Sequence, residues 1–135
     1  MVKDAPTFPK IFGSLRRIIK KQLVACHTHF DRVALSSVIE KYRLPQIDCT
    51  WLDTARVARR AWGKFSHDGY GLKNVADELG IKFNHHVAGE DARAAGEILL
   101  RAIAETGISL EDWLVRVNKP IGLSDGSGKI TRKGN

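Results

Sequence analysis

The sequence predicts a helix-rich α/β domain. Apolar residues recur at intervals of three and four in five or six segments, which is the spacing of a single helix face. Only one short apolar run, Gln22–Cys26, reads as a buried strand. With 135 residues, 43% of them hydrophobic and 27% charged, the chain has the size and apolar content of one folded domain. One strand makes no sheet, so either the fold is all-helical or the rest of a sheet lies outside this chain.

The first half of the chain predicts two helices around the strand. A helix runs from a Thr7 cap to about Lys21, with an apolar face of Phe8, Ile11, Phe12, Leu15, Ile18 and Ile19. After Gln22–Cys26, a second helix covers about 31–42 and ends before Pro45. Its inward residues are Ala34, Leu35, Val38 and Tyr42. A second short strand is expected at Ile47–Cys49.

The second half predicts four more helices. The third covers Trp51–Trp62, with Trp51, Ala55, Ala58 and Trp62 on one face. The fourth is marked by Leu72, Val75, Ala76 and Leu79 and stops at Gly80, and the fifth covers about Gly89–Glu105 and stops at Gly107. Ser109, with Asp112 three positions later, starts a last helix through Val117. We therefore expect one domain at 1–118 and a Gly/Ser/Lys-rich linker at 119–135.

Positive charge is concentrated at the two ends. Residues 1–25 hold six Lys/Arg against one acid, and residues 115–135 hold five against one, whereas the middle is slightly acidic. This balance agrees with a phosphate-rich partner, although charged runs are more often solvated faces and tails. No apolar run is long enough to span a membrane, and two cysteines are too few for a disulfide scaffold. We expect a cytoplasmic protein that does not enter a membrane.

Two helices begin with a carboxylate on their apolar side. Asp91 precedes Ala95 by four positions and Asp31 precedes Leu35 by four. Each acid alone is better explained as a partner of its helix dipole or as a cap. Histidines stand close to both, however, with His27 and His29 before Asp31 and His85 and His86 before Asp91. Acids that hold a hard cation, with a histidine that takes a proton from water, are the components of metal-assisted hydrolysis.

Two motifs resemble a known family. Residues 26–31, Cys-His-Thr-His-Phe-Asp, resemble the second motif of the DEDDh 3′–5′ exonucleases, which include the epsilon proofreading subunit of bacterial DNA polymerase III. Residues 86–92, His-Val-Ala-Gly-Glu-Asp-Ala, resemble the third motif, and the segments 51–56 and 71–76 look like the family's connecting helices. The resemblance covers about residues 5–106 and implies part of a ribonuclease H-like fold.

The resemblance also implies roles for particular residues. Asp31 and Asp91 would be ligands of two Mg²⁺ or Mn²⁺ ions, and His86 would be the general base, since it stands five positions before Asp91. His27 and Phe30 would contact the substrate, the single-stranded 3′ end of DNA, although the family often has His-Asn at residues 26–27. A DNA polymerase is the implied protein partner.

The family's first motif, Asp-x-Glu, has no counterpart here. The only acid upstream of Asp31 is Asp4, and the first three strands of the family's sheet have no equivalent either. We therefore expect a piece of a longer or split gene that is inactive alone. We also expect it to self-associate through an uncovered strand edge, because apolar residues would lack cover, namely Phe8, Phe12, Leu23, Val24, Leu35, Ile98 and Leu99.

Two alternatives remain open. One is a non-catalytic remnant that binds nucleic acid or pairs with a separate N-terminal piece. The other is a helical protein with a structural role or a zinc site drawn from Cys26, His27, His29, His85 and His86, for which a second Cys/His pair of the usual spacing is lacking.

Overall fold

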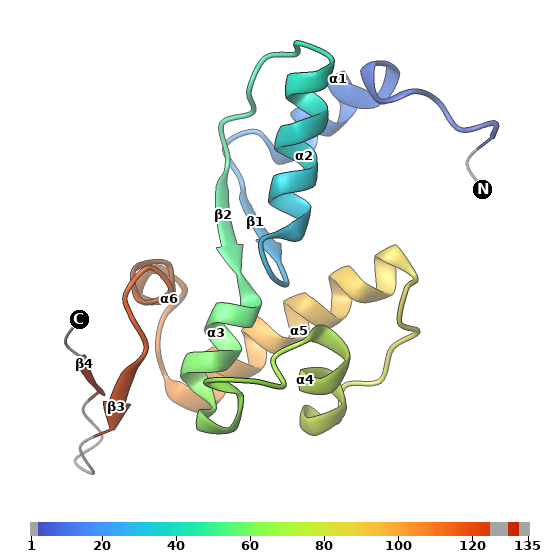
Figure 1. The fold of residues 1–135 in the computed structure, drawn as a ribbon. Helices are drawn as coiled ribbons and strands as arrows, with labels where there is room; N and C mark the ends of the chain where they lie inside the picture. Colours follow the sequence, from blue (N-terminus) through green and yellow to red (C-terminus); the bar gives the residue numbers. More distant parts are fainter. Residues whose placement is uncertain (1–2, 125–129, 133–135) are drawn as a thin grey trace.

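The computed structural model describes residues 3–124 and 130–132. Six α-helices and two small sheets follow one another along this part of the chain (Figure 1). Their bounds are α1 Phe8–Ile19, β1 Leu23–Cys26, α2 Phe30–Lys41, β2 Thr50–Asp53, α3 Thr54–Ala61, η1 Gly63–Phe65, α4 Leu72–Leu79, α5 Ala88–Thr106, α6 Leu110–Arg116, β3 Gly122–Ser124 and β4 Ile130–Arg132. The expected helix-rich α/β character is confirmed.

The central sheet consists of β1 and β2, which pair in parallel from Leu23↔Thr50 to Cys26↔Asp53. The second strand therefore starts at Thr50, and the prediction of a strand at Ile47–Cys49 is wrong. The prediction of a helix from Trp51 is wrong for the same reason, since the helix begins at Thr54. The boundary is set by Asp53, whose carboxylate accepts the backbone N–H groups of Ala55 and Arg56 as the cap of α3.

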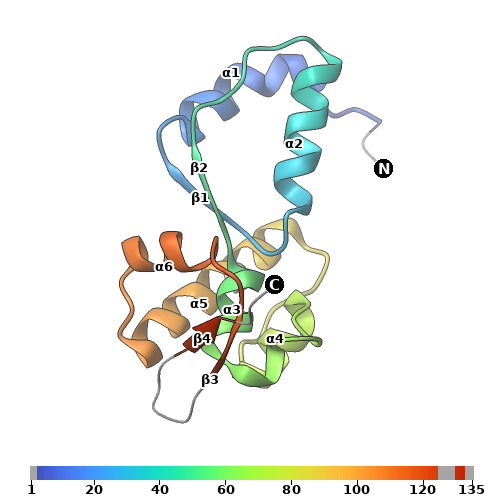
Figure 2. The same ribbon diagram turned by 60° about the vertical axis from the view of Figure 1, so that its left-hand side comes forward.

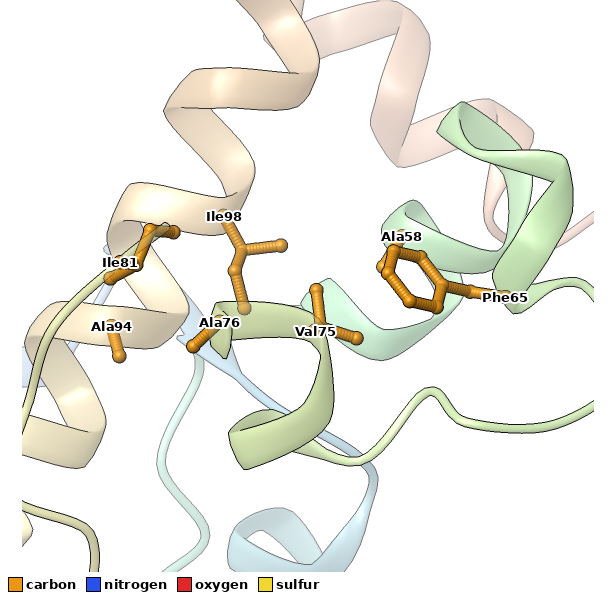
Figure 3. Packing of buried hydrophobic residues seen from close by; sticks show 7 residues of the cluster. All are labelled: Ala58, Phe65, Val75, Ala76, Ile81, Ala94 and Ile98. Atoms are coloured by element: carbon orange, nitrogen blue, oxygen red, sulfur yellow. The ribbon is translucent and has the colours of Figure 1, made fainter. Parts of the chain in front are cut away.

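The core lies between helices α3 to α6. One cluster joins α3, η1, α4 and α5 and contains Ala58, Phe65, Val75, Ala76, Ile81, Ala94 and Ile98 (Figure 3). A second cluster packs β2 and α3 against α5 and α6 around Trp113, and it contains Leu52, Val57, Leu99, Ala102 and Val117. The helical stops after α4 and α5 are confirmed, because Gly80 and Gly107 both adopt the left-handed conformation.

Helices α1 and α2 lie at the other end of the molecule, beside the start of the central sheet (Figures 1 and 2). Of their residues, only Phe12 and Ile39 are buried. The face predicted for α2 is right for Leu35 and Val38, which are half-buried beside Ile39, and wrong for Ala34 and Tyr42, which are exposed. The apolar face of α1 is mostly uncovered, with Ile18 70% exposed.

None of the seven residues expected to lack cover is fully exposed; the exposed apolar residues at this end are Ile11, Ile18, Phe30, Val33 and Tyr42. Ile98 and Leu99, both expected to be uncovered, are buried at 0% and 7% exposure because α3, α4 and α6 pack over α5. Phe12 is also buried, whereas Leu23, Val24 and Leu35 are half-buried.

Part of the expected linker pairs as a hairpin. Strands β3 and β4 are antiparallel, from Gly122↔Arg132 to Ser124↔Ile130. Residues 125–129 and 133–135 of the linker lie outside the described residues. Within the described chain, no helix is both long and apolar enough to cross a membrane.

Candidate functional site

Asp91 forms a polar cluster with the two histidines that precede α5. It lies in the first turn of α5, where its Oδ1 is 3.2 Å from Nδ1 of His85 and accepts the backbone N–H of His86 at 3.3 Å. A carboxylate only accepts hydrogen bonds, so Nδ1 of His85 carries the proton. Nε2 of a neutral His85 is then the basic nitrogen. The arrangement is that of a histidine oriented by a carboxylate, as in hydrolytic sites.

His86, predicted to be the general base, contacts Asp91 through its backbone N–H, whereas His85 contacts it through its ring. It adopts a positive φ of 73°, which is uncommon for a residue other than glycine. This conformation turns its backbone N–H toward Asp91, while its ring lies 3.9 Å from the ring of His85, centroid to centroid. The imidazole in contact with Asp91 is therefore His85. The spacing of the motif does not show which of the two imidazoles contacts Asp91, because that depends on the backbone turn at His86.

Asp31 and Phe30 stand at the start of α2, a few residues beyond the carboxyl end of β1. Asp31 is exposed in the first turn of the helix, and Phe30 is 74% exposed. In Figures 1 and 2 this first turn lies beside the N-terminal half of α5, the helix that carries Asp91. Asp31 thus stands near the carboxyl end of a parallel strand, where α/β proteins commonly bind ligands.

His27, predicted to contact substrate, is instead held by protein groups. Its Nε2 lies 2.7 Å from the carbonyl oxygen of Tyr70, and its Nδ1 lies 2.9 Å from Oγ1 of Thr54. Burial lowers the pKa of His27, and the carbonyl of Tyr70 and the charge of Asp53 oppose this shift less strongly. A neutral ring donates from Nε2 to the carbonyl of Tyr70, and the Thr54 hydroxyl beside Nδ1 donates to the carbonyl oxygen of Cys26 at 3.2 Å. His27 therefore ties the end of β1 to α3 and to the loop before α4.

The donor set for metal ions is partial in this chain. Asp31 and Asp91 offer the oxygen ligands that Mg²⁺ and Mn²⁺ prefer, and Mg²⁺ is often held by one or two carboxylates together with substrate phosphates and water. Among the described residues, no three His, Cys, Asp or Glu side chains gather into one metal-binding group. The five candidate zinc ligands thus do not form a common site there. Burial, with the charges of Asp53 and Asp31, raises the pKa of Cys26 to about 11 and keeps it a thiol.

The chain is a helix-rich α/β protein with distant similarity to a class of DNA polymerases. It is 31% identical over 113 residues to the DNA polymerase III PolC-type of Caldanaerobacter subterraneus subsp. tengcongensis, covering 80% of this chain and 8% of that protein. It is 26% identical over 106 residues to the DNA polymerase III PolC-type of Streptococcus pneumoniae, covering 77% of this chain and 7% of that protein. The chain thus spans less than a tenth of these relatives. No family model and no solved structure matches it.

Proposed function

We propose that this chain is part of a 3′–5′ DNA exonuclease of the DNA polymerase III epsilon type, with a role in DNA replication or repair. The observation that carries the proposal is the contact between Asp91 and the His85–His86 pair at the start of α5, with Asp31 at the start of the neighbouring α2. The similarity to PolC-type DNA polymerase III over most of the chain supports the part of the proposal that concerns DNA replication.

The proposed reaction is hydrolysis of the terminal phosphodiester bond at the 3′ end of DNA. Asp31 and Asp91 would hold the divalent cations, which would supply charge stabilisation and activation of water. A histidine beside Asp91 takes the proton from the attacking water. The motif assigns this role to His86, whereas the contact with Asp91 favours Nε2 of His85. We expect the ring of Phe30, which is 74% exposed, to stack on a base of the single strand.

The chemistry is incomplete in this chain because only two of the four acids of the resembled site are present. Catalytic groups that act as a unit are strongly non-additive, so losing half of the acids removes nearly all activity. We therefore expect no nucleotide release by the chain alone, while metal binding at Asp31 and Asp91 is retained.

Metal binding tests the proposal without requiring turnover. Mn²⁺ titrated into the isotope-labelled chain is expected to broaden the NMR signals of His85 and His86 first. Asp91→Asn should remove this broadening, and Asp31→Asn should weaken it. Asp77→Asn is the matched control, because Asp77 lies on α4 in an ion pair with Lys73. Broadening that survives both Asp31→Asn and Asp91→Asn, or that Asp77→Asn reduces equally, contradicts the proposal.

A nuclease assay completes the test. The purified chain is incubated with Mg²⁺ and a 5′-labelled single-stranded oligonucleotide, and no shortening is expected. Shortening that Asp91→Ala abolishes would overturn the expected inactivity and would support the exonuclease directly. Shortening that Asp91→Ala leaves unchanged would come from a contaminating nuclease or another site, and would count against the assignment.

A second candidate is a non-catalytic remnant that pairs with a separate N-terminal polypeptide. It is favoured by the uncovered end of the molecule. Among the described residues, β1 pairs only with β2, and Ile11, Ile18, Phe30, Val33 and Tyr42 are exposed on α1 and α2 or just beyond. The backbone N–H of Thr50 donates to the carbonyl of Gln22, so the backbone groups of Gln22 point toward β2. Successive residues of a strand point their backbone N–H and C=O groups to opposite edges, so those of Ala25 point away from β2.

This second candidate predicts a specific binding partner, a polypeptide that contributes a strand. Native mass spectrometry of the chain mixed with the polypeptide encoded upstream in the genome should show a one-to-one complex. Ala25→Pro, which removes the N–H on the open edge, should prevent that complex while helices α3–α6 stay folded. A complex that Ala25→Pro leaves intact excludes pairing at this edge.

A further inference from the structure

A pocket lies on the open face of the central sheet. In the parallel register, Val24 pairs with Trp51 and Cys26 with Asp53, so these residues share one face, while Leu52 points to the other face and is fully buried in the core. Cys26, Trp51 and Asp53 of this face line a pocket of about 160 Å³, whose other lining residues are His29, Arg32, Arg56, Val117 and Asn118. Its position at the carboxyl ends of two parallel strands is where α/β proteins commonly bind ligands.

The charges in this pocket favour an anion. Arg32 comes from the first turn of α2, and Arg56 comes from the first turn of α3. The one carboxylate of the lining is Asp53, whose Oδ1 accepts the backbone N–H groups of Thr28 at 2.9 Å, Ala55 at 2.9 Å and Arg56 at 3.3 Å. The lining thus carries two guanidinium groups against one carboxylate. In the described part of the chain, no acid forms an ion pair with Arg32 or Arg56.

Helix α3 adds further positive charge next to this pocket. Arg56 donates one guanidinium N–H to the carbonyl of Val117 at 3.1 Å, which leaves its other N–H groups for a ligand. Arg60 donates to the carbonyl of Arg56 at 2.9 Å. Burial first, and then the charges of Arg56 and Arg59, lower the pKa of the Arg60 guanidinium. Like charges packed this closely repel one another, so a bound anion would relieve the repulsion.

Trp51 gives the pocket an aromatic wall. Its side chain is half-buried, so part of the indole ring faces the pocket. Indole rings stack on nucleic-acid bases, and guanidinium groups bind phosphate oxygens in a fork geometry. The volume is below the range of about 300–1,000 Å³ that encloses a drug-sized ligand. It suits a phosphate group inside the pocket with a base lying at its rim, over Trp51.

We propose that this pocket binds the phosphate group of a nucleotide, with Arg32 and Arg56 on the phosphate oxygens and the base stacked on Trp51. The pocket is distinct from the candidate hydrolytic cluster, because neither Asp31 nor Asp91 lines it. Nucleotide binding in this pocket can therefore be tested separately from the proposed nuclease activity. The phosphate can belong to a free mononucleotide or to a DNA strand, since both present the same chemistry.

Tryptophan fluorescence provides the test. Trp113 is fully buried and the indole of Trp62 donates to Glu105, so a base that stacks on Trp51 should quench one fluorophore selectively. Saturable quenching is expected with dGMP, and at least tenfold weaker binding with deoxyguanosine, which lacks the phosphate. Inorganic phosphate should compete with dGMP without quenching. Comparing dGMP with a phosphorylated dG trinucleotide then distinguishes the free nucleotide from the strand as the tighter ligand.

Variants locate the binding. Arg32→Gln and Arg56→Gln should each weaken dGMP binding about tenfold or more, since each removes charge-assisted hydrogen bonds. Trp51→Leu should abolish the quenching. Arg16→Gln, an exposed arginine of α1, is the charge-matched control and should leave binding unchanged. Asp91→Asn should also leave it unchanged, which separates this pocket from the nuclease proposal. Binding that is insensitive to both Arg32→Gln and Arg56→Gln, or equally sensitive to Arg16→Gln, overturns the inference.

Discussion

Protonation of His27 should cost the protein stability as the pH falls. Burial lowers the pKa of the ring below the ordinary value of 6.5, and the contact with the carbonyl of Tyr70 opposes this shift less strongly. Between these two pKa values the unfolded chain binds a proton that the folded chain does not. Stability therefore rises with pH through this range and is lost as the pH drops below about 6.5.

The size of the effect has an upper limit. If the folded ring stays neutral, the proton taken up by the unfolded chain destabilises the native state by at most about 1.4 kcal/mol between pH 7.5 and pH 5.5. His27→Gln removes this titration. It also weakens the link to Tyr70 and Thr54, at a cost of about 1–2 kcal/mol at pH 7.5, where the wild-type hydrogen bonds are intact.

Urea unfolding followed by circular dichroism, at several pH values, measures the difference. The stability of the wild type should fall more steeply toward pH 5.5 than that of His27→Gln. The other histidines are present in both proteins, so their contributions cancel in the comparison. Parallel curves for the two proteins would refute the structural role of His27. Unchanged stability in His27→Gln together with weaker DNA binding would restore its predicted contact with substrate.

The remaining predictions concern exposed apolar residues and glycines. The chain should self-associate with concentration, and sedimentation velocity should show that Ile18→Gln weakens the association while Leu100→Gln, at a similarly exposed position on α5, does not. Gly107→Ala should lower the free energy of unfolding by about 1 kcal/mol, because this position has a φ of 68°. Gly96→Ala, in the interior of α5 with open space at its Cβ, should raise it by up to about 1 kcal/mol in the same urea assay.

The helices of the second half were predictable because their signals are local. The positions of α4 and α5 follow from apolar spacing and from a glycine stop, and α6 begins as expected with Ser109 accepting the N–H of Asp112 at 3.1 Å. Strand β2 was not predictable in this way. Its four residues overlap a helical pattern that continues through α3, and the strand exists because it pairs with β1, which is distant in sequence.

The site was predictable in part. The sequence predicts Asp31 and Asp91 at the starts of two helices, and the structure puts each in the first turn of its helix, with Asp31 exposed rather than on a buried face. The contact between His85 and Asp91 depends on the left-handed backbone at His86, which no periodicity signals. The structural role of His27 was likewise hidden, because Tyr70 reaches it from a loop 43 positions away.

Helices α3–α6 and helices α1–α2 differ in how well their apolar side chains are covered, and this difference affects both proposed binding sites. Helices α3–α6 form the core around Trp113 and Phe65, whereas α1 and α2 leave large apolar side chains in solvent. The candidate hydrolytic acids and the pocket lined by Arg32 and Arg56 both draw residues from each of these two groups of helices. A polypeptide that covers β1, α1 and α2 would fix α2 against the core. Such a partner would therefore tighten the geometry of Asp31 and Arg32 together, so that metal and nucleotide binding should both strengthen when it binds.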